Sequence, residues 1–171
     1  MLSTAITLLG ETGAEGFTMR RLAARLGINP MTLYHHFGDR AQLIAAMADR
    51  IHAGVAPPAA GSPLERAEGL LRRYHATILR HPALTLLVLT SPGLFPAQAR
   101  RITDSLTGLL IAAGLAPQRA GLWLDILVDF THGAALATAM AAQSGAPEDA
   151  GAGRYDQAIA ALMASLRAEI G

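Results

Sequence analysis

The sequence contains no cysteine, no lysine and few aromatic residues, and no uninterrupted apolar run in it is long. Without cysteine, disulfides and metal sites that use thiolate ligands are excluded. Because no apolar run approaches the roughly 20 residues of a membrane-spanning helix, we expect no membrane partner. The first residues lack the basic segment that opens a secretory signal, so we expect a cytoplasmic protein.

The positive charge of the chain comes from arginine alone, since all 14 basic side chains are arginine. The net charge of +1 does not by itself indicate a polyanionic partner. Between Phe17 and Arg40, however, four arginines face one acidic residue, Asp39, and this stretch carries a net +3. The positive charge is therefore concentrated near the N-terminus.

Alanine and leucine, which both favour helices, dominate the composition, and no useful strand-like alternation occurs. Helix caps, glycines and prolines divide the chain into about nine predicted helices, which makes the fold class all-α. Their expected ranges are 3–12, 19–26, 30–37, 40–53, 63–80, 83–90, 97–113, 117–143 and 154–169. The glycine-rich segment 144–153 is expected to be a loop.

Two of the predicted helices are joined by a very short glycine turn. Gly27 ends the first, and Asn29 caps the second with Pro30 at its first position, where the missing N–H has no cost. Leu33 and Phe37 can point inward, while Asn, Thr, Tyr and two His crowd the outer side. A solvated amphipathic helix is the alternative, but such faces usually carry Glu, Lys and Gln. The pattern therefore predicts a helix-turn-helix whose second helix enters the DNA major groove.

The segment "LAARLGINPMTLYHHFGDRAQLIAAM", residues 22–47, resembles the TetR family of bacterial transcriptional regulators. The shared spacing is Leu-Ala, three residues, Gly-Ile, then Thr-Leu-Tyr, one residue, His-Phe, and the upstream "LLGETGAEGFTMRRLA" fits as well. The resemblance implies a three-helix DNA-binding head, followed by a helical body that forms a dimer and encloses a ligand pocket.

The resemblance also implies roles for single side chains of the head. By matching position, it implies phosphate contacts for Thr18, Tyr34, His36 and Arg40. Base contacts fall on Arg20, on the start of the reading helix from Asn29 to Thr32, and on His35. Arg21 follows Arg20 in the predicted helix 19–26 and is added to this set. The predicted DNA-binding residues are then Thr18, Arg20, Arg21, Asn29, Pro30, Met31, Thr32, Tyr34, His35, His36 and Arg40.

The proline-rich segment "GVAPPAAGS", 54–62, is typical of a linker. Directly after it, Ser62 and Glu65 form a predicted capping box that opens the next helix. We therefore expect a helix-turn-helix DNA-binding domain at 1–53, and a helical ligand-binding and dimerisation domain at 54–171.

The second half is similar to tetracycline-repressor-like members of the family in "TSPGLFP" and "DFTHGAAL". By position, the two metal-chelating histidines of those members are replaced here by Val88 and Asp129. We therefore expect no metal and no cofactor, and an effector other than a magnesium–tetracycline complex. The mostly apolar helices of this half favour an apolar or amphipathic small molecule as the effector. The residues expected to line its pocket are Tyr74, Ile78, Leu86, Trp123, Asp129 and His132.

Asp125, Asp129 and His132 recur at helical spacing on one face of an otherwise apolar helix. They form a metal or acid–base site, or a polar patch on a pocket wall, or they pair with an arginine such as Arg119 or face solvent. The first reading would make the chain a metal-dependent hydrolase. Two further histidines, His75 and His81, are expected at the surface or at helix ends.

The small-sided run from Gly133 to Ala142 lets another helix approach closely. Together with Leu162, Met163 and Leu166, it predicts a homodimer through the last two helices. A two-fold dimer also matches a palindromic DNA operator. We thus predict a ligand-responsive repressor and not an enzyme; a DNA-binding protein with no effector and the hydrolase are the alternatives.

Overall fold

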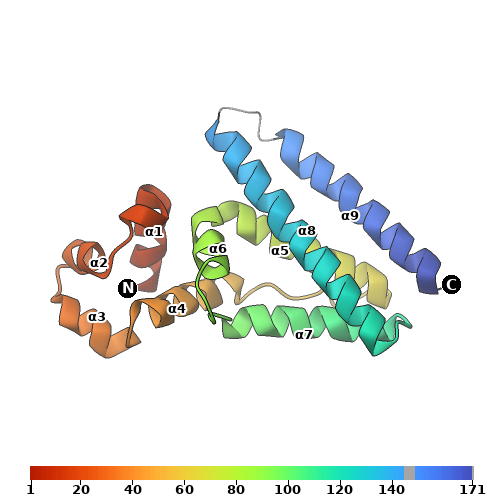
Figure 1. Cartoon of the computed structure of the whole chain (residues 1–171), viewed down its shortest axis with the longest axis horizontal. Coiled ribbons are helices and arrows are strands. Elements are labelled where there is room, and N and C mark those ends of the chain that lie inside the picture. The colour runs from red at the N-terminus through yellow and green to blue at the C-terminus, as the bar shows by residue number, and fades with distance from the viewer. Residues whose placement is uncertain (145–148, 171) are drawn as a thin grey trace. The chain divides into compact units, whose positions relative to one another are not determined.

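The computed structural model describes residues 1–144 and 149–170, and this part of the chain is all-helical with nine helices (Figure 1). The predicted fold class is confirmed. The helices are α1 (Leu2–Gly16), α2 (Met19–Leu26), α3 (Pro30–Phe37), α4 (Arg40–His52), α5 (Pro63–Arg80), α6 (Pro82–Leu89), α7 (Ala97–Ala112), α8 (Pro117–Gln143) and α9 (Asp149–Ile170).

The chain forms two compact units. The first, called the head here, contains Met1–Ala53 and His81–Arg100; the second, the body, contains Gly54–Arg80 and Arg101–Gly171. The head thus contains the predicted segment 1–53 together with residues 81–100, which the prediction placed in 54–171. Leu84 and Leu87 of α6 are buried in the same core as α1 and α4, although the linker precedes them in the sequence.

The core of the head is built from leucines and a few larger side chains that α1 to α4 and α6 supply. Leu9, Leu22, Leu33 and Met47 are each no more than 1% exposed. Burial of such side chains contributes about 1.5–3 kcal/mol each. This core fixes α2 and α3 against α1 and α4, and so fixes the position of the predicted reading helix.

Helix α1 differs from its predicted range of 3–12. It continues to Gly16, but Gly13 has a positive φ of 66° and kinks the helix. The prediction placed a helix end at this glycine. The chain instead resumes helical geometry after one left-handed residue, which glycine adopts without a steric penalty.

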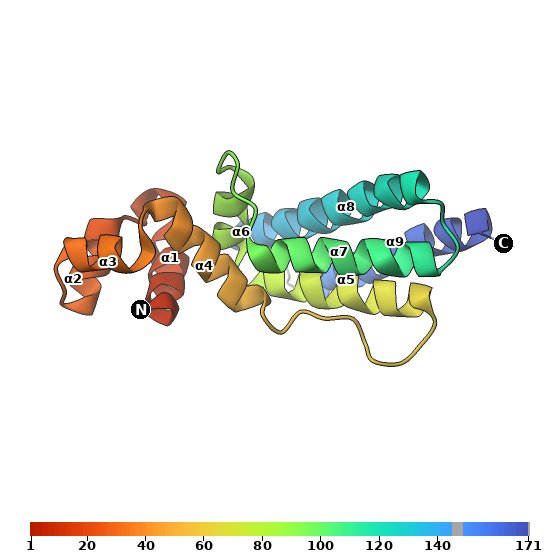
Figure 2. The same cartoon turned by 90° about the horizontal axis from the view of Figure 1, so that it is seen from below.

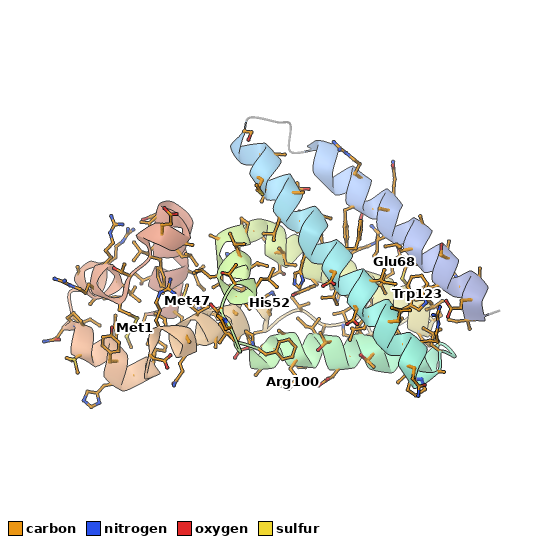
Figure 3. The ribbon with its side chains drawn as sticks, in the orientation of Figure 1. Met1, Met47, His52, Glu68, Arg100 and Trp123 are labelled. Atoms are coloured by element: carbon orange, nitrogen blue, oxygen red, sulfur yellow. The ribbon has the colours of Figure 1, made fainter. Side chains whose placement is uncertain are left out.

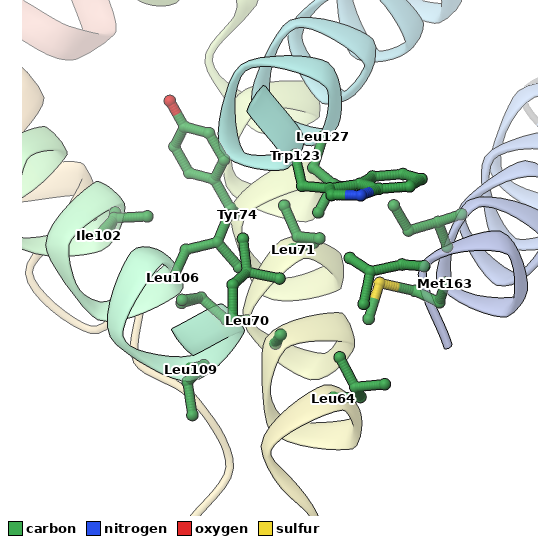
Figure 4. Close-up of a cluster of buried hydrophobic side chains, with 14 of the residues drawn as sticks. Leu64, Leu70, Leu71, Tyr74, Ile102, Leu106, Leu109, Trp123, Leu127 and Met163 are labelled. Carbon is green, nitrogen blue, oxygen red and sulfur yellow. The ribbon is translucent and has the colours of Figure 1, made fainter. Parts of the chain in front are cut away.

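The body packs α5, α7, α8 and α9 around a second core (Figure 2). Figure 4 shows side chains of all four helices converging, including Leu70, Leu106, Leu127 and Met163. The predicted capping box opens α5: the backbone N–H and the hydroxyl of Ser62 donate to Glu65 Oε2 at 2.7 and 2.9 Å.

The last two helices run antiparallel side by side (Figure 1), and α9 begins earlier than predicted. It starts at Asp149 instead of Arg154, and residues 145–148 of the expected loop lie outside the described residues. Met163 and Leu166 are 2% and 0% exposed, and Leu162 packs against the same core. Met163 and Leu166 therefore stabilise the single chain and are not available for the predicted dimer contact, whereas Leu162 is only partly buried.

Helix α8 is the one helix in the described part of the chain that is long and apolar enough, by length and composition alone, to cross a membrane. A helix that packs inside a soluble protein meets the same criterion. Charged residues interrupt this helix, which is why no apolar run stands out in the sequence. Only 17% of its apolar window is fully buried within the chain, and the rest is partly or fully exposed.

Candidate nucleic-acid interface

Helices α2 and α3 form the predicted helix-turn-helix. Thr18 caps α2 by accepting a hydrogen bond from the backbone N–H of Arg21 at 3.2 Å. Gly27 ends α2 in the left-handed region, with φ of 66°. Asn29 Oδ1 then accepts the backbone N–H of Met31 at 2.9 Å, with Pro30 at the start of α3. Each break and start follows from a local sequence signal.

Helix α3 has one inner and one outer side. Leu33 is fully buried, and Phe37 packs half-buried against the core of the head. Met31 and Tyr34 are 61% and 41% exposed. The predicted DNA-binding side chains are all exposed except Pro30, which is half-buried, and they come from α2, α3 and the start of α4.

The arginines of the head are not equivalent. Arg25 donates two hydrogen bonds to the Glu11 carboxylate, and this pairing with Arg25 holds the Glu11 pKa below its usual value. Arg21 donates to the carbonyl oxygen of Gly16 at 3.0 Å. The charge estimate from residues 17–40 missed Glu11 because it lies earlier in the sequence, on α1. Arg25 is therefore not a free phosphate ligand, whereas Arg20 and Arg40 make no ion pair among the described residues.

In the body, Tyr74 and His132 meet across α5 and α8. The Tyr74 hydroxyl and His132 Nε2 lie 2.7 Å apart. Burial raises the pKa of Tyr74 to about 12 and lowers the pKa of His132, with Asp129 opposing the latter shift. At neutral pH the phenol therefore keeps its proton, and which of the two groups donates depends on the imidazole tautomer.

The other predicted effector residues have different surroundings. Ile78 and Trp123 are buried in the body core, and Trp123 Nε1 (labelled residue in Figure 3) donates to Glu169 at 3.0 Å. Asp129 is exposed on α8. Leu86 belongs to the head, where it is 46% exposed.

The three open interpretations of the polar stripe on α8 can now be compared. Asp125 and Asp129 are exposed, and Arg119 pairs with Glu169 instead of either aspartate. Among the described residues, no three His, Cys, Asp or Glu side chains gather as a metal site. The geometry thus supports solvent exposure for the two aspartates.

Sequence reasoning missed a stacked cluster between α5, α8 and α9. The His75 ring lies parallel to Tyr155, with centroids 3.6 Å apart, and Phe130 stacks on Tyr155 at 5.8 Å. The Tyr155 hydroxyl contacts Thr131 Oγ1 at 3.0 Å. The expectation of a surface or capping His75 was wrong, since it is 5% exposed. In the sequence, the burial of His75 could have been inferred only from its place on the same helix as residues 70, 71, 74 and 78, which are also buried.

Residues 1–47 match the family described as "Bacterial regulatory proteins, tetR family". The tetracycline repressor of class E from Escherichia coli is 31% identical over 141 residues, which cover 80% of this chain and 65% of that protein. These matches support a TetR-family regulator. The class C repressor of Escherichia coli is 45% identical over 49 residues, 29% of this chain. That alignment spans only 22% of the class C protein.

Two solved structures of TetR-like fold cover nearly the whole chain. A TetR variant from Acinetobacter baumannii AYE, in complex with minocycline, has a TM-score of 0.83 and 19% identity, covering 99% of this chain and 96% of that one. BioQ with its double-stranded DNA operator has a TM-score of 0.79 and 22% identity, covering 98% and 95%. At these identities the likeness concerns the fold.

Proposed function

We propose that this TetR-family protein is a ligand-responsive transcriptional repressor that binds a palindromic DNA operator as a homodimer. The observation that carries the proposal is α3: its inner side is fixed by the fully buried Leu33, while its outer side is exposed and carries hydrogen-bonding groups. The DNA-bound BioQ structure, which has the same fold, supports the same use of this surface.

Within this proposal, the helix N-termini and arginines of the head position the phosphate backbone. The N-terminus of α2, capped by Thr18, presents backbone N–H groups and a positive helix dipole. Arg20, Tyr34 and Arg40 are exposed. Such contacts add affinity on any sequence, and contacts from α3 to base edges add discrimination.

The dimer is proposed to form through the accessible faces of α8 and α9. Leu122, Ile126 and Met140 on α8 are 46%, 38% and 68% exposed, and an apolar patch of this kind indicates a partner surface. On α9, Ala160, Ala161 and Ala164 are exposed at helical spacing and allow close approach. A second copy covers both faces and places two reading helices about 34–36 Å apart, in successive major grooves.

The effector is proposed to bind in the body, where Tyr74 and His132 form a polar pair within a largely apolar helix layer. An amphipathic molecule suits such a lining, because it satisfies the polar pair while burying apolar surface. It releases DNA only by binding better to the non-binding arrangement of the dimer. Asp129→Asn should leave DNA binding unchanged and alter this release if Asp129 contributes to the site.

The decisive experiment is selection of bound duplexes from a random DNA pool, using the full-length protein. We expect an enriched palindrome whose affinity falls steeply with salt, since counterions are released from phosphates. Recovery of unrelated sequences, or retention that does not depend on salt, would refute DNA recognition by this head. A panel of amphipathic compounds is then tested for release of the selected duplex.

A further inference from the structure

Helix α3 carries an apolar side chain on its outermost line, next to the polar groups expected of a reading helix. At about 100° per residue, positions two before and two after Leu33 are each rotated by about 200° from it. Those positions are Met31 and His35. Since Leu33 is fully buried, Met31 and His35 point most directly away from the core of the head.

The neighbouring side chains lie on the flanks of the same helix. Thr32 and Tyr34 are one residue from Leu33, about 100° to either side. His36 is three residues after Leu33 and so lies about 60° from it around the helix, edge-on to the half-buried Phe37 with ring centroids 4.6 Å apart. The flanks suit the phosphate walls of a groove, and the Met31–His35 line suits its floor.

Met31 is also exposed in a way that packing within the chain does not explain. It is 61% exposed and is absent from the apolar side chains that pack against the head core. The start of α3 is held in place around it, because Asn29 Oδ1 accepts its backbone N–H at 2.9 Å. A flexible thioether at a fixed backbone position adapts to a small apolar partner.

We propose that Met31 is a specificity-determining residue that reads the C5 methyl group of a thymine in the major groove. The methyl is the one apolar group that a base pair presents there. Met31 then selects thymine in each half-site, while His35, one helical turn further on, reads a different base pair by hydrogen bonding. This inference rests on the proposed function, since it requires that α3 enters the groove.

The test uses the duplex selected from the random pool and replaces its thymines by deoxyuracil one at a time, which deletes a single methyl group. The parent protein should lose about fourfold in affinity per half-site at one thymine, the effect of one buried methyl. Met31→Ala should bind the thymine and uracil duplexes equally. Met31→Leu, which keeps an apolar side chain, should retain a preference for thymine.

The control is Ile111→Ala, an equally apolar exposed position on α7 of the body, which should show the same methyl sensitivity as the parent. Circular dichroism verifies that the variants are helical. The inference is overturned if no single uracil weakens binding, if the selected site lacks thymine, or if Met31→Ala stays sensitive to the methyl. Selection of no sequence at all would instead refute the proposed function itself, and this inference with it.

Discussion

At the scale of single residues, the arginines of the head divide by their partners. Arg25 is held in a two-point pair by Glu11, whereas Arg40 is exposed and makes no ion pair among the described residues. A guanidinium already paired with a carboxylate has less to gain from a phosphate. The division separates the arginines proposed as phosphate ligands from a structural side chain that composition alone treats alike.

This division predicts different salt dependences for two substitutions of the same kind. Arg40→Ala should weaken binding about equally on all sequences and flatten the slope of log affinity against log salt by about one unit per half-site. Arg25→Ala should leave the slope unchanged, because Arg25 is already paired with Glu11. The variant should stay folded, since an exposed ion pair contributes little to stability. Titrations of the selected duplex at several salt concentrations measure both slopes; equal slopes for the two variants would contradict the assignment.

The buried histidines of the body make stability depend on pH. Burial lowers the pKa of His75, with the Asp156 charge opposing, and burial lowers that of His132 in the same way. His75 Nε2 has no hydrogen-bond partner among the described residues, and the ring is stacked on Tyr155. Asp156 itself pairs with Arg72, which also binds Glu68, so the acidic charge near His75 is partly neutralised.

We therefore expect the urea midpoint of the chain to fall as pH decreases from about 7.5 to 5.5. A histidine with a lowered folded pKa binds its proton more readily in the unfolded chain, so its stabilisation is present above about 6.5 and lost below it. His75→Phe keeps the stacking and should reduce this dependence. The lowered carboxyl pKa values of Glu11, Glu65 and Glu169 act below about 4.5, outside this window. An unchanged pH dependence in His75→Phe would contradict the assignment.

At the scale of elements, the turn between α2 and α3 depends on backbone conformation more than on space. Gly27 has φ of 66°, yet a Cβ there would meet no atom within 4 Å. Gly10 on α1 is equally open and has ordinary helical geometry. The two glycines thus differ in conformation alone.

Alanine at these two positions should have opposite effects on the free energy of unfolding. Gly27→Ala forces a side chain into the left-handed region and should destabilise the head by about 1 kcal/mol. Gly10→Ala should stabilise it by about 0.5–1 kcal/mol, because alanine loses less entropy in a helix. Urea unfolding followed by circular dichroism compares them, and destabilisation by both would indicate that space, not conformation, is limiting.

At the scale of the whole molecule, α8 and α9 have accessible faces that no other described part of the single chain covers. Two of the residues expected to form the dimer contact, Met163 and Leu166, are buried in the body core, yet small and apolar residues remain on the outer faces. The proposed second copy covers those faces. A palindromic operator then follows from the two-fold symmetry.

The dimer is tested by Ala164→Arg, which places a long charged side chain on the proposed contact face of α9. Light scattering at micromolar concentration should give twice the chain mass for the parent and the chain mass for the variant. Ala76→Arg, at an exposed position on α5, is the matched control and should stay dimeric. Circular dichroism should show all three folded; a monomeric parent, or a dimeric Ala164→Arg, would count against this interface.

The sequence by itself determined the helices of this protein and the limits of the helix-turn-helix. Those features depend on neighbours in the chain: Thr18, Asn29 and Asp39 cap the next helix, and Gly27 permits the turn. Its exposed reading face was also predictable, because helical spacing places Met31 and His35 opposite an apolar Leu33.

Only the tertiary structure decided which distant residues meet. Glu11 neutralises Arg25, α6 joins the head, and His75 stacks on Tyr155, each across a long stretch of chain. The same is true of Met163 and Leu166, whose apolar character fits a dimer contact and an internal core equally well. Periodicity shows which face of a helix is apolar, but not what covers it, since that depends on the packing of elements that are far apart in the sequence.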